Sequence, residues 1–302
     1  MAARPAHRPS AEPTSRPGRG TQDLAALLRL HFATLREDLA RKDDRERAVH
    51  RARRHVKSMR GLLRLAWPDR EARSGDIAVL DRSLKSLADH LAPARDERVA
   101  ARTADGLAGR CKGEAAAWLA SLAQTAHAAA ARGEINRQGA ARQRRAIAAI
   151  ETRLAGLSWP RTPDDLALSL GRWHRRARRA LAEALALGDA EALHDARTSV
   201  VRVLVQVEAL AAAGGGFAGR LRGLDRLRAA LGEHHDLALL AHRIAASSPP
   251  APVGKAVLAA LARRQRRLER EAVRLHARWH GPASGLERKA RKRLTRRGRG
   301  KP

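Results

Sequence analysis

Five basic residues recur at helical spacing in one short segment of the chain. They stand at i, i+3, i+7, i+10 and i+14 and are His50, Arg53, Lys57, Arg60 and Arg64. On a helix of 3.6 residues per turn they form one stripe roughly 21 Å long. Like charges at this spacing repel one another, and neither Asp nor Glu occurs in residues 48–67. The stripe therefore predicts contact with an elongated anion, and the alternative is an ordinary solvated helix face.

The start of this stripe is repeated in the second half of the chain. The His-x-x-Arg motif of residues 50–53 returns at residues 194–197, so that His194 and Arg197 match His50 and Arg53. The second copy is shorter, because Val201 and Leu204 stand where the first copy has Lys and Arg. Arg202 lies at the edge of the same face. We therefore expect an asymmetric binding cleft in which the first half contributes more of the cations.

A longer correspondence surrounds the two motifs. Residues 84–96 and 224–236 share a Leu-x-x-Leu-x-x-x-Leu pattern at an offset of 140 positions. Upstream, His31 precedes His50 by 19 residues and His174 precedes His194 by 20. Four anchors in the same order predict an internal duplication of about 140 residues, which exceeds the usual length of a solenoid repeat. The basic residues of these segments that join the candidate set are Lys85, Arg95, Arg226 and His235.

The segment His234-His235-Asp236 could instead hold a metal ion together with His194 and Asp195. A metal-dependent phosphohydrolase would be the corresponding enzyme, and its centre needs three or four converging ligands. The matching position in the first half is Arg95, and arginine offers no lone pair to a metal ion. We therefore favour anion contact, predict neither catalysis nor a cofactor or metal, and keep the phosphohydrolase as the less favoured alternative.

The whole chain shares the basic character of the stripe. Its formal charge is +30, from 61 Lys and Arg against 31 Asp and Glu. Residues 285–302 contribute +8 of this and residues 1–20 contribute +3, which leaves +19 on the remainder. Such a body attracts phosphate-rich polymers or anionic surfaces.

Composition and periodicity predict an all-α protein. Only 2% of the residues are aromatic, and Ala, Leu and Arg, which are strong helix formers, dominate. We predict two tandem four-helix-type bundles, at residues 21–157 and 164–281, each with its own core and related by the duplication. Basic disordered segments flank them at residues 1–20 and 282–302. Within the second bundle, Gly232 is expected to separate two helices.

The sequence also gives expectations for the compartment. Cys111 is the single cysteine, so neither a disulfide framework nor a cysteine metal site is expected. No run of eighteen apolar residues occurs, and the N-terminus lacks the apolar segment of a signal peptide. We therefore expect a soluble, cytoplasmic protein.

Three segments together resemble the conserved histidine α-helical domain (CHAD) family. They are the His-x-x-Arg-x-x-x-Lys pattern of residues 50–57, the Leu-His-Asp-Ala-Arg sequence of residues 193–197, and the segment of residues 227–240 with its Leu-Gly-x-x-His-Asp-Leu-Ala core. The resemblance spans roughly residues 21–281. It implies two four-helix bundles about a pseudo-twofold axis, with basic residues and the signature histidines lining a central cleft that binds inorganic polyphosphate. It also implies association with polyphosphate or polyhydroxyalkanoate granules.

The expected function is thus non-catalytic polyphosphate binding. The candidate binding residues are His50, Arg53, Lys57, Arg60, Arg64, Lys85, Arg95, His194, Arg197, Arg202, Arg226 and His235. The alternative binding partner is nucleic acid, which the Arg- and Lys-rich segment after Leu286 would contact through backbone phosphates.

Overall fold

The protein is an assembly of long helices in the computed structural model. The structure describes residues 19–41, 45–68, 75–91, 93–132, 137–157, 159, 162–214, 216–279 and 283–296. Within these ranges it contains eleven helices and no strand. They are α1 (Arg19–Ala40), α2 (Arg45–Ala66), α3 (Gly75–His90), α4 (Pro93–Ala108), α5 (Gly113–Arg132), α6 (Arg137–Ala155), α7 (Pro163–Leu187), α8 (Ala190–Gly214), α9 (Ala218–Ala246), α10 (Ala251–Trp279) and α11 (Ala283–Arg296). The all-α prediction is confirmed.

Local sequence signals set several helix ends. α4 begins at Pro93, whose fixed φ suits the first turn of a helix. α7 begins with a capping box, in which the Thr162 hydroxyl accepts from the Asp165 backbone N–H while the Asp165 carboxylate accepts from the Thr162 backbone N–H. Gly188 ends α7 with a φ of 66°, a left-handed conformation that favours glycine.

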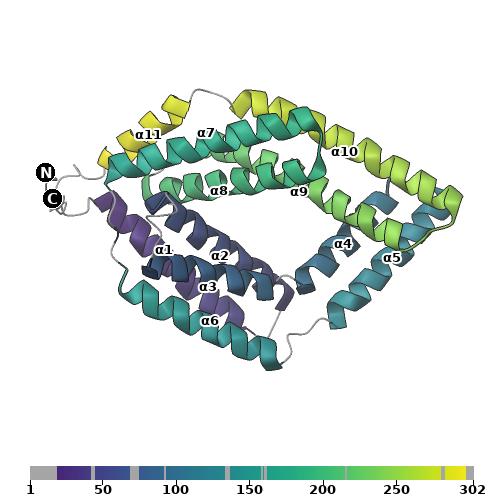
Figure 1. The fold of residues 1–302 in the computed structure, drawn as a ribbon, viewed down its shortest axis with the longest axis horizontal. Helices are drawn as coiled ribbons and strands as arrows, with labels where there is room; N and C mark the ends of the chain where they lie inside the picture. Colours follow the sequence, from purple (N-terminus) through teal and green to yellow (C-terminus); the bar gives the residue numbers. More distant parts are fainter. Residues whose placement is uncertain are drawn as a thin grey trace, which may run out of the picture.

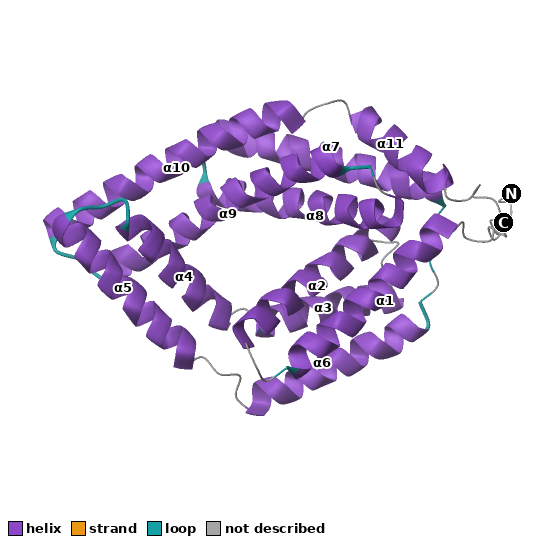
Figure 2. Ribbon diagram, turned by 180° about the vertical axis from the view of Figure 1, so that it is seen from behind, coloured by secondary structure: helices purple, strands orange, loops and turns teal. Residues whose placement is uncertain are grey.

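The helices form two main packing groups. α1, α2, α3 and α6 share a hydrophobic core with α7, α8, α11 and the first half of α9. α4 and α5 pack instead with α10 and the second half of α9. Figure 1 shows this second group at the right of the molecule, and Figure 2 shows the same grouping from behind.

Each core therefore draws on both halves of the chain, whereas we expected one core in each half. The buried positions of α4 and α5 are mostly alanines, such as Ala104, Ala115 and Ala123, so this pair has little apolar volume of its own. It buries its face against larger residues of α9 and α10, including Leu237 and Leu261. The internal duplication itself stays a prediction.

Two expectations about the second half are wrong. The segment after Gly285 is not a mobile tail over residues 283–296, because Leu286, Ala290 and Leu294 form a buried face of α11 that packs against α7. The helix around Gly232 is not interrupted, because α9 runs through that position. The expected disordered arm lies, up to residue 18, outside the described residues, and so does the end of the C-terminal segment, residues 297–302.

None of the described helices combines the length and apolar character that crossing a membrane requires.

Candidate functional site

α2 and α8 cross at very short range, and this crossing brings the two halves of the chain together. A Cβ atom on Gly61 of α2 would lie 2.4 Å from Cγ1 of Val205 on α8, so only glycine fits there without movement. The fully buried Gln206 amide donates to the Gly61 carbonyl oxygen at 3.4 Å. The first-half stripe therefore lies directly beside α8.

A basic groove lies beside this crossing. We call it the α2–α8 groove, and it is an open hollow of about 170 Å³. Its lining residues are Lys57, Arg60, Gly61 and Arg64 of α2 with Arg197, Thr198, Val201, Arg202 and Val205 of α8. Five of these nine are cationic and, among the described residues that line it, none is acidic. The structure thus brings together five of the predicted binding residues from both halves.

An acidic residue of a third helix partly balances the groove. The Asp81 carboxylate of α3 accepts from Arg60 at 2.7 and 3.4 Å and from Arg64 Nη2 at 3.5 Å. The stripe therefore has a counter-charge from another helix, although residues 48–67 themselves contain no acid. Arg53, which precedes the groove residues in the stripe, donates to the Ala88 carbonyl oxygen of α3 at 2.6 Å.

Trp173 of α7 contacts two of the groove's arginines. Its indole N–H donates to the Arg64 carbonyl oxygen at 3.1 Å, which ties α7 to α2. The Arg202 guanidinium lies over its ring, with Cζ 4.4 Å from the ring centroid. Such stacking favours a fixed orientation of the guanidinium. On the other side, Arg197 passes Gly232 of α9 at ordinary contact distance, with its Nε 3.6 Å from where a Cβ would lie at that position.

His50 lies apart from the α2–α8 groove. It lines a second basic hollow between α2 and α4, the α2–α4 pocket. The residues of that pocket are Arg47, Val49, His50, Arg51, Arg98, Val99 and Arg102. The sequence analysis did not include Arg98 and Arg102 among the candidate binding residues. Their spacing of i, i+4, which places two cations on one face of α4, could have indicated them.

The other predicted binding residues lie outside the α2–α8 groove, at several separate places. His194 pairs with His235 of α9, with their Nδ1 atoms 3.1 Å apart. Lys85 is exposed and bonds Asp89 on its own helix at 2.8 Å. Arg226 lines a separate pocket formed by α9, α10 and α11. The Arg95 side chain lies outside the described residues.

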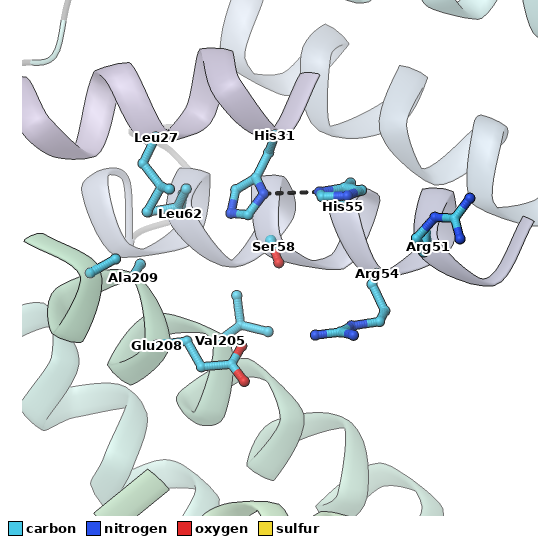
Figure 3. A pocket seen from close by; sticks show the side chains of 11 residues that line it. Leu27, His31, Arg51, Arg54, His55, Ser58, Leu62, Val205, Glu208 and Ala209 are labelled. Atoms are coloured by element: carbon cyan, nitrogen blue, oxygen red, sulfur yellow. Dashed lines mark hydrogen bonds between the residues drawn. The ribbon is translucent and has the colours of Figure 1, made fainter. Parts of the chain in front are cut away.

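A third hollow lies on the other side of the α2–α8 crossing. Figure 3 shows His31 of α1 facing His55 of α2, while Arg54 of α2 extends towards Glu208 of α8. The two Nδ1 atoms are 3.0 Å apart, so one imidazole donates and the other accepts. Asp38, which is buried, bonds Arg51 at 2.7 Å and lies 3.7 Å from His55 Nε2.

This histidine pair resists protonation. Burial is the largest cause that lowers the pKa of His31 to about 4, and the neighbouring His55 and Arg54 add to it. Burial also lowers the pKa of His55, although Asp38 opposes that shift. Both rings are therefore neutral at pH 7.

We expect these histidines to make the fold sensitive to acid. Between pH 6.5 and pH 4 the unfolded chain binds a proton at His31 that the folded chain excludes, so stability falls as the pH decreases through this window. Urea unfolding at pH 7.5 and pH 5 should show this fall, and His31→Gln should reduce it. An equal pH dependence in the variant and the unchanged chain would contradict the assignment.

The two neighbouring histidines of the possible metal site, His234 and His235, contact different side chains and do not converge on one point. His234 is buried and its Nε2 lies 3.1 Å from a carboxylate oxygen of Glu269 on α10, whereas His235 faces His194. Within the described ranges, no group of three His, Cys, Asp or Glu side chains is placed to hold a metal ion.

Comparison with known proteins identifies the fold and the family. The crystal structure of the CHAD domain from the plant Ricinus communis is similar over 96% of this chain and 97% of that chain, with a TM-score of 0.50 and 17% sequence identity. A search of curated proteins found no match. The family model of the CHAD domain matches residues 25–245. With this match over most of its length, the chain belongs to the CHAD domain family.

Proposed function

We propose that the protein binds inorganic polyphosphate in the α2–α8 groove without transforming it. The observation that carries this proposal is the meeting of five cations from α2 and α8 in one hollow whose described lining contains no carboxylate. Four of the five are arginines, which can engage phosphate oxygens through paired N–H donors. A polymer of phosphates satisfies several such cations at once.

The α2–α4 pocket extends the proposed path along the same helix. Arg47 and His50 lie near the start of α2 and line that pocket, whereas Lys57 and Arg64 line the groove farther along. The two pockets together span the predicted stripe, roughly 21 Å at 1.5 Å per residue. This length supports an elongated ligand over a single phosphate ion. On this proposal, the protein acts where polyphosphate accumulates, as at polyphosphate or polyhydroxyalkanoate granules.

Nucleic acid is the second candidate ligand, because α11 exposes Arg288 and Lys292. Displacement of labelled long-chain polyphosphate by increasing amounts of duplex DNA or of unlabelled polyphosphate, both counted as phosphate, distinguishes the two ligands. We expect DNA to displace the label only at about tenfold higher concentration or more, since phosphate contacts alone bind DNA weakly.

Charge changes on α11 complete this test. Deleting the helix would uncover the core that Leu286 and Leu294 help to close, so substitution is the better probe. Arg288→Glu with Lys292→Glu should weaken DNA binding and leave polyphosphate binding intact. Equal displacement by DNA, together with loss of polyphosphate binding in this variant, would contradict the proposal.

Removing the charge of Asp81 is expected to strengthen polyphosphate binding. Asp81→Asn removes the carboxylate charge beside Arg60 and Arg64 but keeps an oxygen acceptor. We expect polyphosphate affinity to rise about threefold, on the order of 0.7 kcal/mol, as for a partly exposed charge near an anion. Titration of labelled polyphosphate measures the change, and weaker binding in the variant would show that the groove does not receive the anion.

A further inference from the structure

The pocket formed by α9, α10 and α11 is strongly basic and takes no part in the function proposed above. It has a volume of about 460 Å³ and shares no lining residue with the α2–α8 groove. Five cations line it, from all three helices: Arg220, Arg222 and Arg226 of α9, Arg278 of α10 and Lys289 of α11. Among the described residues of its lining none is acidic.

Two carboxylates on the helices that form the pocket are paired with cations outside its lining. Asp225 of α9 accepts from Arg228 at 2.8 Å. Glu287 of α11 lies 3.5 Å from Nη1 of Arg175 on α7. Each of these two carboxylates therefore has an ion-pair partner outside the pocket lining.

Two of the cations are held by contacts that leave the charge in the pocket. Arg220 is half-buried, and its Nη1 donates to Nε2 of the fully buried His174 at 3.3 Å. Burial lowers the pKa of Arg220, which means that its charged form would gain from an anion. Lys289 Nζ lies 5.4 Å from the ring centroid of Phe217, the residue that precedes α9.

On the α9 side of the pocket, two glycines leave the helix backbone uncovered by side chains. Gly219 and Gly223 are one turn apart on the same face, and a Cβ at either position would meet nothing within 4 Å. Ligand atoms can thus approach the helix surface between the arginines. The same space makes Gly223 a position where a side chain can be added without a clash.

We propose that this pocket binds a triphosphate group, a compact anion with enough charge to engage five cations on three helices. Its pocket volume lies in the range of ordinary small-ligand sites. The triphosphate could belong to free inorganic tripolyphosphate or to a nucleoside triphosphate. This site is distinct from the α2–α8 groove, because the two linings have no residue in common.

Calorimetric titration of the full chain with sodium tripolyphosphate and, separately, with ATP tests the proposal at about 150 mM salt, where weak surface charge effects are screened. Gly223→Glu places a carboxylate among the arginines, and we expect it to weaken tripolyphosphate binding about tenfold or more. Gly223→Gln adds the same volume without charge and should have a smaller effect. Ala120→Glu, on the exposed face of α5, makes the same charge change elsewhere and should leave the affinity within about twofold.

The ATP arm identifies the source of the triphosphate. Loss of both ligands in Gly223→Glu supports a site that accepts nucleotides, and loss of tripolyphosphate alone supports an inorganic ligand. Arg222→Gln with Arg278→Gln provides a second variant in case Gly223→Glu fails to fold. Unchanged tripolyphosphate binding in the pocket variants, or its loss in a Lys57→Glu groove variant instead, would overturn the proposal. The pocket variants should still bind long polyphosphate in the α2–α8 groove, so loss of tripolyphosphate binding in them leaves the function proposed above standing.

Discussion

Replacing Lys57 and Thr198 together by glutamate is expected to weaken polyphosphate binding about a hundredfold while leaving the helices intact. Both side chains are exposed and line the α2–α8 groove from opposite helices, so the change adds two carboxylates where phosphate oxygens would lie. At a protein surface each such repulsion costs on the order of 1–2 kcal/mol. Titration of labelled long-chain polyphosphate measures the loss, and circular dichroism measures helicity.

Two matched variants make this result specific. Lys57→Gln with Thr198→Gln keeps similar side-chain lengths without negative charge and should have a clearly smaller effect. Ala120→Glu adds one negative charge on exposed α5, away from the groove, and should bind like the unchanged chain. Losses that follow only the change in net charge, which is −3 for the double glutamate variant and −1 for Ala120→Glu, would mean that the groove is not the site.

Gly61→Ala is expected to destabilise the fold, against the usual effect of this substitution. Within a helix, glycine to alanine ordinarily stabilises by about 0.5–1 kcal/mol. At Gly61 the added methyl would lie 2.4 Å from Cγ1 and 3.1 Å from Cβ of the buried Val205, so the Val205 side chain or the two helices must shift. Overpacking of this kind costs about 1–3 kcal/mol in the free energy of unfolding, which urea denaturation measures.

The chain offers both a control and a rescue for this prediction. Gly106 of α4 is exposed, and a Cβ there would meet only Arg110 Nη1 at an ordinary 3.7 Å. Gly106→Ala should therefore be neutral or stabilising. Adding Val205→Ala to Gly61→Ala removes the contacted methyl groups and should recover part of the lost stability. A stable single variant at Gly61 would show that the crossing is looser than its geometry indicates.

The sequence located the first half of the site well, because helical spacing is a local property. Lys57, Arg60 and Arg64 share a face of α2 whatever the rest of the chain does, and all three line the groove. Which helix faces that stripe depends on the crossing at Gly61, which no local pattern specifies. The same limit hid the pairing of Asp81 with Arg60 and the separation of His50 from the groove.

The prediction of a disordered C-terminal segment relied on composition and was wrong for residues 283–296. Its many Arg and Lys residues suggested a disordered tail, although Leu286, Ala290 and Leu294 recur at i, i+4 and i+8. That spacing forms a narrow apolar stripe, which is sufficient when a core is available to receive it. The long stems of the charged residues can extend to solvent beside such a stripe. Short apolar periodicity therefore indicated α11 more reliably than charge content did.

Val201 shows a related point about the second stripe. It interrupts the basic pattern of α8 and suggested that this half contributes less to binding. In the structure it lies inside the groove, between Arg197 and Arg202, and forms part of its wall. The asymmetry between the halves is thus in the number of cations, three from α2 and two from α8, within one shared groove.

The salt dependence of polyphosphate binding tests the central claim most directly. If the groove cations bind the polymer by neutralising phosphates, the logarithm of the association constant falls linearly with the logarithm of salt concentration. Each groove cation removed by a neutral substitution, such as Lys57→Gln, should reduce the slope by about one unit. Ala120→Gln should leave the slope unchanged. Binding that hardly depends on salt, or a slope unaltered by loss of Lys57, would contradict polyphosphate binding in the α2–α8 groove.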